Sequence, residues 1–378
     1  MQRGEASLDR IASVTVSQVV LPLRAAISDA KVLTGRQKPL TEIPFLFAEI
    51  RTESGLEGVG YSYSKRAGGD GQYAHAREIA PELIGEDPSD IQRIWTKLVW
   101  RGASVGRSGL AVQAIAAFDI ALWDLKAKRA GLPLAKLLGA HRDSVACYNT
   151  SGGFLSSSIE EVIENAHATA ANGIGGVKIK VGQPDTRIDL KRVAAVKDAI
   201  GEDGIALMVD ANQQWDRSTA VRMGRALEEF ELTWIEEPLD AYDAEGHADL
   251  ARELATPIAT GEMLTSVAEH AELIRHRSAD FIQPDAPRVG GITPFLKIMA
   301  MGEAANVRMA PHYVMEIHLH LAAAYEHDPW VEHFDWLEPL FDERLETRGG
   351  RMVVPSRPGL GVSISGQARA WTTATETC

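Results

Sequence analysis

The stretch GIGGVKIKVG at residues 173–182 decides the fold, because it joins a strand pattern to two charges. Val177, Ile179 and Val181 alternate there with Lys178 and Lys180. A period of two is typical of a β-strand with one apolar face. That face predicts burial against neighbouring elements. The lysines on the other face are unusual inside a domain, and they indicate a polar site.

Short apolar strand-like stretches recur from about residue 144 onward. Most of them are separated by helix-length segments, and seven further candidates are VACYNTSG, IALMVDANQ, TWIEEPL, PIATGEM, FIQPDAP, VRMAPHY and WVEHFDW. Alternating β and α segments predict a parallel sheet, and eight of them fit a closed barrel of about 200 residues. Little chain separates the helix expected at 314–326 from the last strand. The predicted fold class is therefore α/β, a modified TIM barrel of type (β/α)7β over residues 136–344.

The first 135 residues have a different texture and predict an α+β domain. A strand is expected at 13–23 and two more at 45–64, where the glycines fit a hairpin better than a phosphate loop because no helix follows at once. Residues 71–131 are expected to be helical and to end in a long amphipathic run stopped by glycine and proline. Residues 28–42 are polar, cationic and not periodic, so they predict a long loop, either a binding loop or a mobile surface segment.

Composition excludes several classes of function. The 378 residues carry a formal charge of -13 without a basic block, which argues against a nucleic-acid partner. The cysteines, Cys147 and Cys378, form neither a disulfide framework nor a metal motif. We find no apolar signal core and no run of about 18 apolar residues, so no membrane partner is expected. A reducing cytoplasm is the predicted location.

Polar residues recur near the end of each predicted strand. Asp210, Glu236 and Glu262 follow one another at equal steps of 26 residues, and the series continues with Asp285, His312 and Glu332. Such steps match the length of a βα unit, so these residues should share the C-terminal rim, where barrel enzymes build their active sites. Three converging carboxylates predict a site for a hard cation, with Mg²⁺ the usual choice. The alternative is that each acid forms a separate ion pair or helix cap.

The two lysines and the histidine are candidate acid–base groups. Lys178 and Lys180 should lower each other's pKa, and a nearby cation should lower both further, from the usual ~10.4 toward the neutral range where a base works. His312 and Asp285 could form a dyad in which the carboxylate orients the imidazole. A zinc site within PHYVMEIHLH is disfavoured, because HExxH is absent and His318 and His320, two residues apart, would point to different sides of a helix.

Together these motifs resemble the mandelate racemase group of the enolase superfamily over nearly the whole chain. The resemblance rests on VKIKVG, VDANQ, WIEEP, TGEM, QPDAPRVGGIT, PHYVMEIH, WVEH and LPLAKLLGAHR. Four loop motifs are similar to those of the aldarate dehydratases in that group, namely SDAKVLTGRQKPLTE, SYSKRAGG, CYNTSGG and WIEEPLDAYD.

The resemblance implies a capping domain at 1–135, completed by residues 345–378, over the barrel. It implies a Mg²⁺-dependent dehydratase of a C6 aldaric acid, L-talarate or galactarate, which removes the α-proton through a metal-held enediolate and expels the β-hydroxyl. The implied Mg²⁺ ligands are Asp210, Glu236 and Glu262. Lys180 is implied as one acid–base group, and His312, paired with Asp285, as the other on the opposite face. For dehydration we assign Lys180 as the base and His312 as the acid. The implied substrate contacts are Lys178, Asn212, Glu262 and Glu332.

A C6 diacid has a second carboxylate, and two cap loops offer charges for it. Lys31, Lys65 and Arg66 are our candidates for the distal end, and Asp29 could accept bonds from its hydroxyls; solvated loop charge is the alternative. A homo-oligomer is expected from the resemblance. Competing functions are a 2-hydroxy-acid racemase or epimerase, a dehydratase of another hexarate such as glucarate, a non-catalytic sugar-acid binder, and a Schiff-base aldolase.

Overall fold

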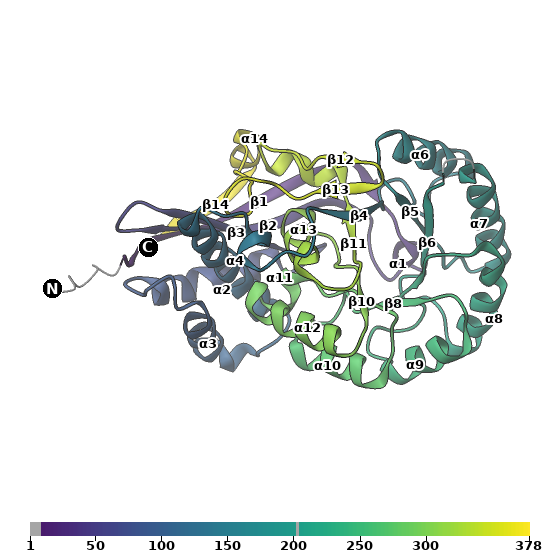
Figure 1. Ribbon diagram of the computed structural model, residues 1–378, viewed down its shortest axis with the longest axis horizontal. Helices are drawn as coiled ribbons and strands as arrows, with labels where there is room; N and C mark the ends of the chain where they lie inside the picture. Colours follow the sequence, from purple (N-terminus) through teal and green to yellow (C-terminus); the bar gives the residue numbers. More distant parts are fainter. Residues whose placement is uncertain (1–8, 202–203) are drawn as a thin grey trace.

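The computed structural model describes residues 9–201 and 204–378, so the first eight residues of the predicted cap lie outside the described chain. Figure 1 shows a sheet-and-helix cap beside a barrel of strands ringed by helices. The barrel strands run parallel in the order β11-β4-β5-β6-β7-β8-β9-β10. Their bounds are β4 Ser144–Asn149, β5 Gly176–Lys180, β6 Ala206–Asp210, β7 Ile235–Glu236, β8 Ile258–Thr260, β9 Phe281–Ile282, β10 Arg308–Met309 and β11 Trp330–His333.

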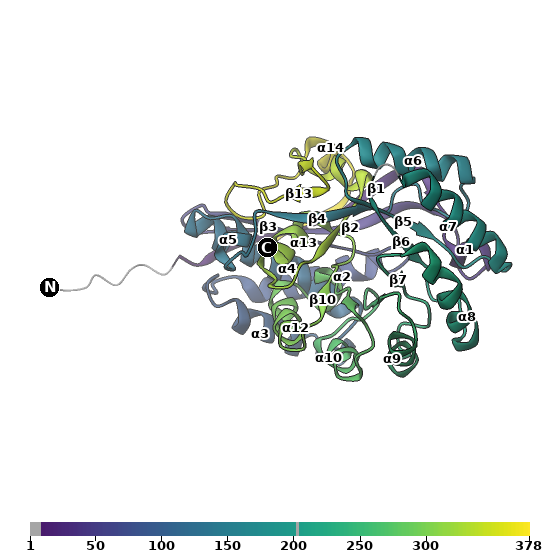
Figure 2. The ribbon, with the colours of Figure 1, turned by 45° about the vertical axis from the view of Figure 1, so that its right-hand side comes forward.

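A helix follows each barrel strand except the last. These helices are α6 Ile159–Ala171, α7 Thr186–Ile200, α8 Arg217–Leu227, α9 Ala244–Glu253, α10 Val267–His276, α11 Ala286–Val289, α12 Ile292–Ala304 and α13 Met315–Ala324. After β11 the described chain forms a 3₁₀ turn at Asp335–Leu340 in place of an eighth helix. The predicted (β/α)7β architecture is therefore confirmed, with α6 to α9 on the outer side of the barrel in Figures 1 and 2.

Strand β5 separates its two faces as the alternation predicted. Val177, Ile179 and Val181 pack among the apolar residues of the surrounding helices, with Val193 of α7 in the same cluster. The interior face carries the lysines, and Lys178 is only 2% exposed. The barrel interior also holds a separate apolar cluster made of Tyr148, Met208, Trp234, Ala259, Phe281 and Ala310. The Tyr148 ring of this cluster has its centre 5.2 Å from Nζ of Lys178, so the packed apolar cluster borders the polar side chains.

The cap is a four-stranded antiparallel sheet in the order β14-β1-β2-β3, covered by helices. Its elements are β1 Ile11–Ile27, α1 Ala30–Leu33, β2 Leu40–Thr52, β3 Glu57–Tyr63, α2 Gly69–Ile79, α3 Ile91–Arg101, α4 Leu110–Ala130, α5 Leu134–Leu137 and β14 Thr372–Thr377. The expectation of an irregular loop at 28–42 was partly wrong. Asp29 accepts hydrogen bonds from the amides of Lys31 and Val32 and so starts α1, and β2 already begins at Leu40.

Helix α4 also departs from the amphipathic run that its sequence suggested. It is buried on nearly all sides, because β2 and β3 cover one side while α11 and α12 of the barrel pack on another. The close approach requires small residues: a Cβ on Gly60 of β3 would lie 2.1 Å from the carbonyl oxygen of Ala117. The glycines of the hairpin thus serve helix packing. Within the described residues, no helix combines the length and apolarity that a membrane span requires.

The C-terminal segment contacts both parts of the molecule. Strands β12 (Thr347–Arg348) and β13 (Arg351–Val353) form a ribbon that pairs with barrel strand β4. The chain then continues through α14 (Gly366–Ala370) to β14, which pairs with β1 of the cap. The segment runs across the top of Figure 1 in yellow. The domain boundaries at 135 and 345 stay a prediction.

His320 of α13 joins three distant segments through its ring. Its Nδ1 accepts a hydrogen bond from the amide of Ala135 at 3.2 Å, and its Nε2 donates to the carbonyl of Leu360 at 2.9 Å. Burial lowers the pKa of His320 to about 4, which matches a neutral ring that uses one nitrogen as acceptor and the other as donor. This ring fixes the cap–barrel junction and the C-terminal segment onto α13.

Replacing His320 with leucine should lower the free energy of unfolding by about 2–6 kcal/mol, because two buried backbone groups lose their partners at about 1–3 kcal/mol each. Chemical denaturation followed by circular dichroism measures this. The matched control is His141→Leu, since His141 is exposed. Equal effects of the two substitutions would contradict the role assigned to the His320 ring.

Candidate active site

The register of the parallel strands brings the predicted acids together. Lys180 of β5 lies opposite Asp210 of β6, and Asp210 lies opposite Glu236 of β7. Glu262 follows the next strand, β8, by two residues. One carboxylate oxygen from each of the three acids lies within 4.8 Å of the others, and all three side chains are buried. The equal spacing in sequence has become a single cluster, which we call the carboxylate cluster.

Hydrogen bonds hold the members of the carboxylate cluster in place. Glu236 accepts from Lys178 Nζ at 2.5 Å, from Trp234 Nε1 at 3.0 Å and from Gln283 Nε2 at 2.7 Å. Asp210 accepts from the amide of Asn212 at 2.7 Å and from its side-chain nitrogen at 3.0 Å. These donors fix the direction of each carboxylate, as outer partners do for metal ligands.

The chemistry of the carboxylate cluster fits a divalent cation. Burial and then the neighbouring Asp210 and Glu262 raise the pKa of Glu236 to about 8, against the opposing effect of Lys178. Burial is the larger cause, and the contribution of Asp210 and Glu262 shows that negative charges lie close together here. A hard cation among the three oxygens would relieve that crowding. Glu237 does not join the cluster: it bonds instead to Gln213 at 2.8 Å.

The expectation of a lowered lysine pKa was wrong for the protein without a cation. Burial lowers the pKa of Lys180, and Lys178 lowers it further, but the carboxylate of Asp210, which bonds its ammonium, raises it above the ordinary value. The pKa of Lys178 is likewise raised, because Glu236 and Glu332 outweigh burial. The sequence indicated that the two lysines repel each other. Only the fold shows that Asp210, Glu236 and Glu332 lie close enough to raise the lysine pKa values. A cation shared with Asp210 would oppose this shift.

His312 and Asp285 form the expected dyad. The Nδ1 atom of His312 lies 2.8 Å from Oδ2 of Asp285, and its Nε2 lies 3.7 Å from Oε2 of Glu262. Asp285 is the N-cap of α11, where it accepts from the amide of Arg288 at 3.0 Å. Burial raises the pKa of Asp285, but its bond to His312 outweighs that effect and keeps it below the usual range. The dyad thus meets the carboxylate cluster at Glu262, whereas Lys180 meets it at Asp210.

Glu332 of β11 completes this side of the site. It accepts from Lys178 Nζ at 2.8 Å, from Thr150 Oγ1 at 2.7 Å and from the amide of Tyr313 at 2.8 Å. Burial raises its pKa, but Lys178 and His312 outweigh this and lower it to about 2. Lys178 is therefore shared by Glu236 and Glu332, with the ionised form of Glu332 the more strongly stabilised.

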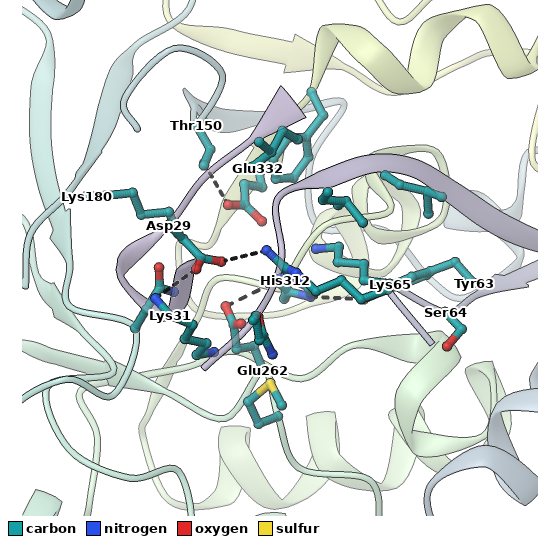
Figure 3. A pocket seen from close by; sticks show the side chains of 18 of the residues that line it. Asp29, Lys31, Tyr63, Ser64, Lys65, Thr150, Lys180, Glu262, His312 and Glu332 are labelled. Atoms are coloured by element: carbon teal, nitrogen blue, oxygen red, sulfur yellow. Dashed lines mark hydrogen bonds and ion pairs between the residues drawn. The ribbon is translucent and has the colours of Figure 1, made fainter. Parts of the chain in front are cut away.

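The cap loops close over the same space. Asp29, Lys31, Lys65 and Arg66 line a cavity of about 300 Å³ together with Lys178, Lys180, Asn212, Glu262, His312 and Glu332. Figure 3 shows Asp29, Lys31 and Lys65 of the cap facing barrel residues across this cavity. All predicted substrate-contact residues therefore line one cavity, although their roles stay predictions.

The charged side chains of the cap differ in the contacts that they make within the protein. Arg66 forms an ion pair with Asp29 at 3.2 Å and donates to the carbonyl of Lys38 at 3.1 Å. The ammonium of Lys65 lies 3.9 Å from the centre of the Tyr313 ring. Burial, and to a smaller extent Arg288, lower the pKa of Lys65 to about 8 despite nearby acids. A half-buried ammonium with so low a pKa gains strongly from an incoming anion.

Several residues of the site were not predicted from the sequence. Tyr63 donates to Asp285 at 2.7 Å, Gln283 orients Glu236, Thr150 orients Glu332, and Arg288 bonds both Tyr63 and Met263. The only sequence signal was the alternation in YSYS, which places Tyr61 and Tyr63 on one face of β3. Polar residues without a strand-end position gave no other sign.

The histidines once considered for zinc have backbone partners. His318 Nε2 accepts from the amide of Ala286 at 3.0 Å, which fixes the residue after Asp285. Burial lowers the pKa of His318 to about 4, so the ring is neutral. Together with the two bonds of His320, this contact explains PHYVMEIHLH without a metal.

Comparisons with known proteins agree with this geometry. Residues 30–139 match the family model of the mandelate racemase / muconate lactonizing enzyme N-terminal domain, and residues 161–368 match the enolase C-terminal domain-like model. The chain is 65% identical over 364 residues to the L-talarate/galactarate dehydratase of Salmonella typhimurium, covering 96% of this chain and 91% of that protein.

Two crystal structures superpose closely on the chain. That of the Salmonella typhimurium LT2 enzyme with Mg and L-lyxarohydroxamate has a TM-score of 0.98 at 63% identity, covering 100% of this chain and 96% of that one. That of an L-talarate dehydratase from Polaromonas sp. JS666 with Mg and L-glucarate has a TM-score of 0.96 at 67% identity, covering 98% and 99%. The chain therefore belongs to the mandelate racemase/muconate lactonizing enzyme family of the enolase superfamily.

Proposed function

We propose that this protein is a Mg²⁺-dependent aldarate dehydratase that converts L-talarate, galactarate or both into a keto-deoxy-hexarate. The observation that carries the proposal is the carboxylate cluster, which Lys180 approaches at Asp210 and His312 approaches at Glu262. A proton donor and a proton acceptor therefore sit at two separate edges of one cation site. The identity of 65% to an L-talarate/galactarate dehydratase supports the choice of substrate.

The α-proton of a carboxylate is very weakly acidic, so its removal needs positive charge that stabilises the developing enediolate. Asp210, Glu236 and Glu262 would hold Mg²⁺, which when bound supplies positive charge beside the substrate carboxylate. Lys178 adds a second positive charge next to the same position. Lys180, as the neutral amine, takes the α-proton.

His312 then serves the leaving group. Its imidazolium gives a proton to the departing β-hydroxyl, which leaves as water, and the enol that remains tautomerises to the keto acid. Asp285 stabilises the imidazolium and fixes which nitrogen faces the cavity. Lys31, Lys65 and Arg66 bind the distal carboxylate, and Asp29 accepts from hydroxyls between the two ends.

The direct test is incubation of the purified protein and Mg²⁺ with L-talarate, galactarate and the other hexaric acid stereoisomers, glucarate among them. Keto-acid product is detected as its semicarbazone, and the proposal predicts turnover of L-talarate or galactarate above the other isomers. The absence of keto acid from every isomer would overturn it.

Epimerisation is a second activity that one observation favours. Lys180 and His312 meet the carboxylate cluster at different acids, so protons can be exchanged from two sides. In D₂O, deuterated diacid of inverted configuration would show epimerisation beside dehydration. Inverted diacid without any keto acid would make the protein an epimerase instead.

Mg²⁺ affinity should fall as the pH is lowered from 8 to 6. Because burial and the neighbouring carboxylates raise the pKa of Glu236, a larger fraction of this carboxyl group carries a proton at pH 6 than at pH 8 in the cation-free protein, and Mg²⁺ must displace that proton. Up to one proton should be released for each Mg²⁺ bound at pH 7. Isothermal titration calorimetry in buffers of different ionisation enthalpy measures that number, and a value near zero at pH 7 would contradict the protonated state of Glu236.

Added EDTA should abolish dehydration, and excess Mg²⁺ should restore it.

We also propose that the protein works in the cytoplasm as a homo-oligomer, which the family resemblance supports. Light scattering coupled to size-exclusion chromatography tests the assembly, and a mass of one chain would contradict it.

A further inference from the structure

Tyr63 is a cap residue that reaches the acid–base dyad of the barrel. It is the last residue of β3 and is almost fully buried. Its hydroxyl lies 2.7 Å from Oδ2 of Asp285 and 3.3 Å from Nδ1 of His312. Figure 3 shows the Tyr63 side chain reaching in from the cap toward His312. The dyad therefore has a third member that comes from the other part of the molecule.

The surrounding donors decide the direction of each proton. Nε of Arg288 donates to the Tyr63 oxygen at 3.3 Å, so the tyrosine proton is free to point at Asp285. Oδ2 of Asp285 then accepts from both Tyr63 and Nδ1 of His312, while Oδ1 accepts from the Arg288 amide. Because Nδ1 carries its proton toward Asp285, Nε2 of His312 is the nitrogen that exchanges protons on the side of Glu262.

We propose that Tyr63 is a positioning residue, which orients Asp285 and thereby holds His312 in the geometry for protonating the leaving hydroxyl. The inference rests on the proposed dehydratase function and extends it, since it makes the acid step depend on a residue of the cap. Proton removal by Lys180 does not use this network, because Lys180 contacts Asp210 on another strand. Loss of the Tyr63 hydroxyl should therefore slow protonation of the leaving hydroxyl by His312 and leave proton removal by Lys180 nearly unchanged.

The neighbouring Tyr61 provides a matched control. It lies on the same face of β3, is equally buried, and its hydroxyl donates to Oε2 of Glu316 in the barrel at 3.0 Å. Tyr61 does not line the active-site cavity. Tyr61→Phe and Tyr63→Phe each remove one hydroxyl that joins cap to barrel, but only the second removes one from the dyad.

The experiment compares two rates in D₂O for the wild type and both variants with Mg²⁺ and the preferred hexarate. Proton NMR follows deuterium entering the α-position of unreacted substrate, and product analysis follows dehydration. For Tyr63→Phe we expect dehydration to fall at least tenfold while exchange changes less than threefold, so that exchange per dehydration rises at least about threefold. Tyr61→Phe should keep the wild-type ratio.

Three results would overturn the proposal: equal loss of both rates in Tyr63→Phe, no loss of dehydration, or the same altered ratio in Tyr61→Phe. A wild type that dehydrates no hexarate would instead refute the proposed function, and the two failures are thus distinct. If Tyr63→Phe does not fold, 3-fluorotyrosine at position 63 keeps the ring and the hydroxyl but makes the proton more acidic. An unchanged ratio of exchange to dehydration in that protein would contradict the role of Tyr63.

Discussion

Lys180→Ala is expected to lower the rate of dehydration by about 10³-fold, the middle of the range for loss of a general acid–base group. The substitution removes the amine that bonds Asp210 directly, while Lys178 stays 4.0 Å from Asp210 and keeps its bonds to Glu236 and Glu332. Deuterium exchange at the α-carbon should fall in parallel, because the proton is no longer taken up. Keto-acid formation and NMR measure the two rates on the same sample.

The same variant should bind Mg²⁺ at least as tightly as the wild type. Removing a cation beside Asp210 reduces the charge that competes with the metal, so calorimetry separates loss of the base from loss of the site. Lys191→Ala, at an exposed position on α7, is the matched control and should retain full activity. Full turnover by Lys180→Ala would refute the mechanism, and a lysine adduct trapped by borohydride in the wild type would support the Schiff-base alternative.

His312→Asn should also lower dehydration by about 10³-fold, but with a different signature. Asparagine keeps an N–H donor for Asp285 near the position of Nδ1, yet it cannot supply a proton to the leaving hydroxyl. Since Lys180 is untouched, substrate should continue to exchange its α-proton with D₂O. The expected result is deuterated diacid with almost no keto acid.

A matched substitution at the exposed His141 controls for the loss of an imidazole. His141→Asn should leave both rates unchanged. If His312→Asn abolished exchange together with dehydration, the division of roles between Lys180 and His312 would be reversed or shared. If it preserved dehydration, another group in the cavity would have to be the acid.

Much of the fold follows from periodicity. The alternation in VKIKVG predicted one strand, and the eight short apolar strands, most of them separated by helix-length segments, predicted a parallel barrel. The same reasoning failed for α4. A helix buried on nearly all sides has no polar stripe, and the sequence did not show that the cap sheet and the barrel both cover it.

Part of the active site could also be predicted from the periodicity of the sequence. Equal steps of 26 residues place Asp210, Glu236 and Glu262 at equivalent points of consecutive βα units, so their convergence was predictable without knowing any distance. The dyad of Asp285 and His312 followed from the same series. The residues that orient them did not, because Gln283, Thr150 and Arg288 reach the site through contacts that no repeat encodes.

The charges of the active site show what the sequence determines and what only the tertiary structure decides. The sequence by itself determined that Lys178 and Lys180 share one face of a strand and that acids gather at its end, because strand period and repeat length are local properties. Only the tertiary structure decided that Asp210 and Glu332 balance those lysines, and that Tyr63 from a separate sheet reaches Asp285. The energy of a charge depends on every neighbour within a few ångströms, and those neighbours come from all parts of the folded chain.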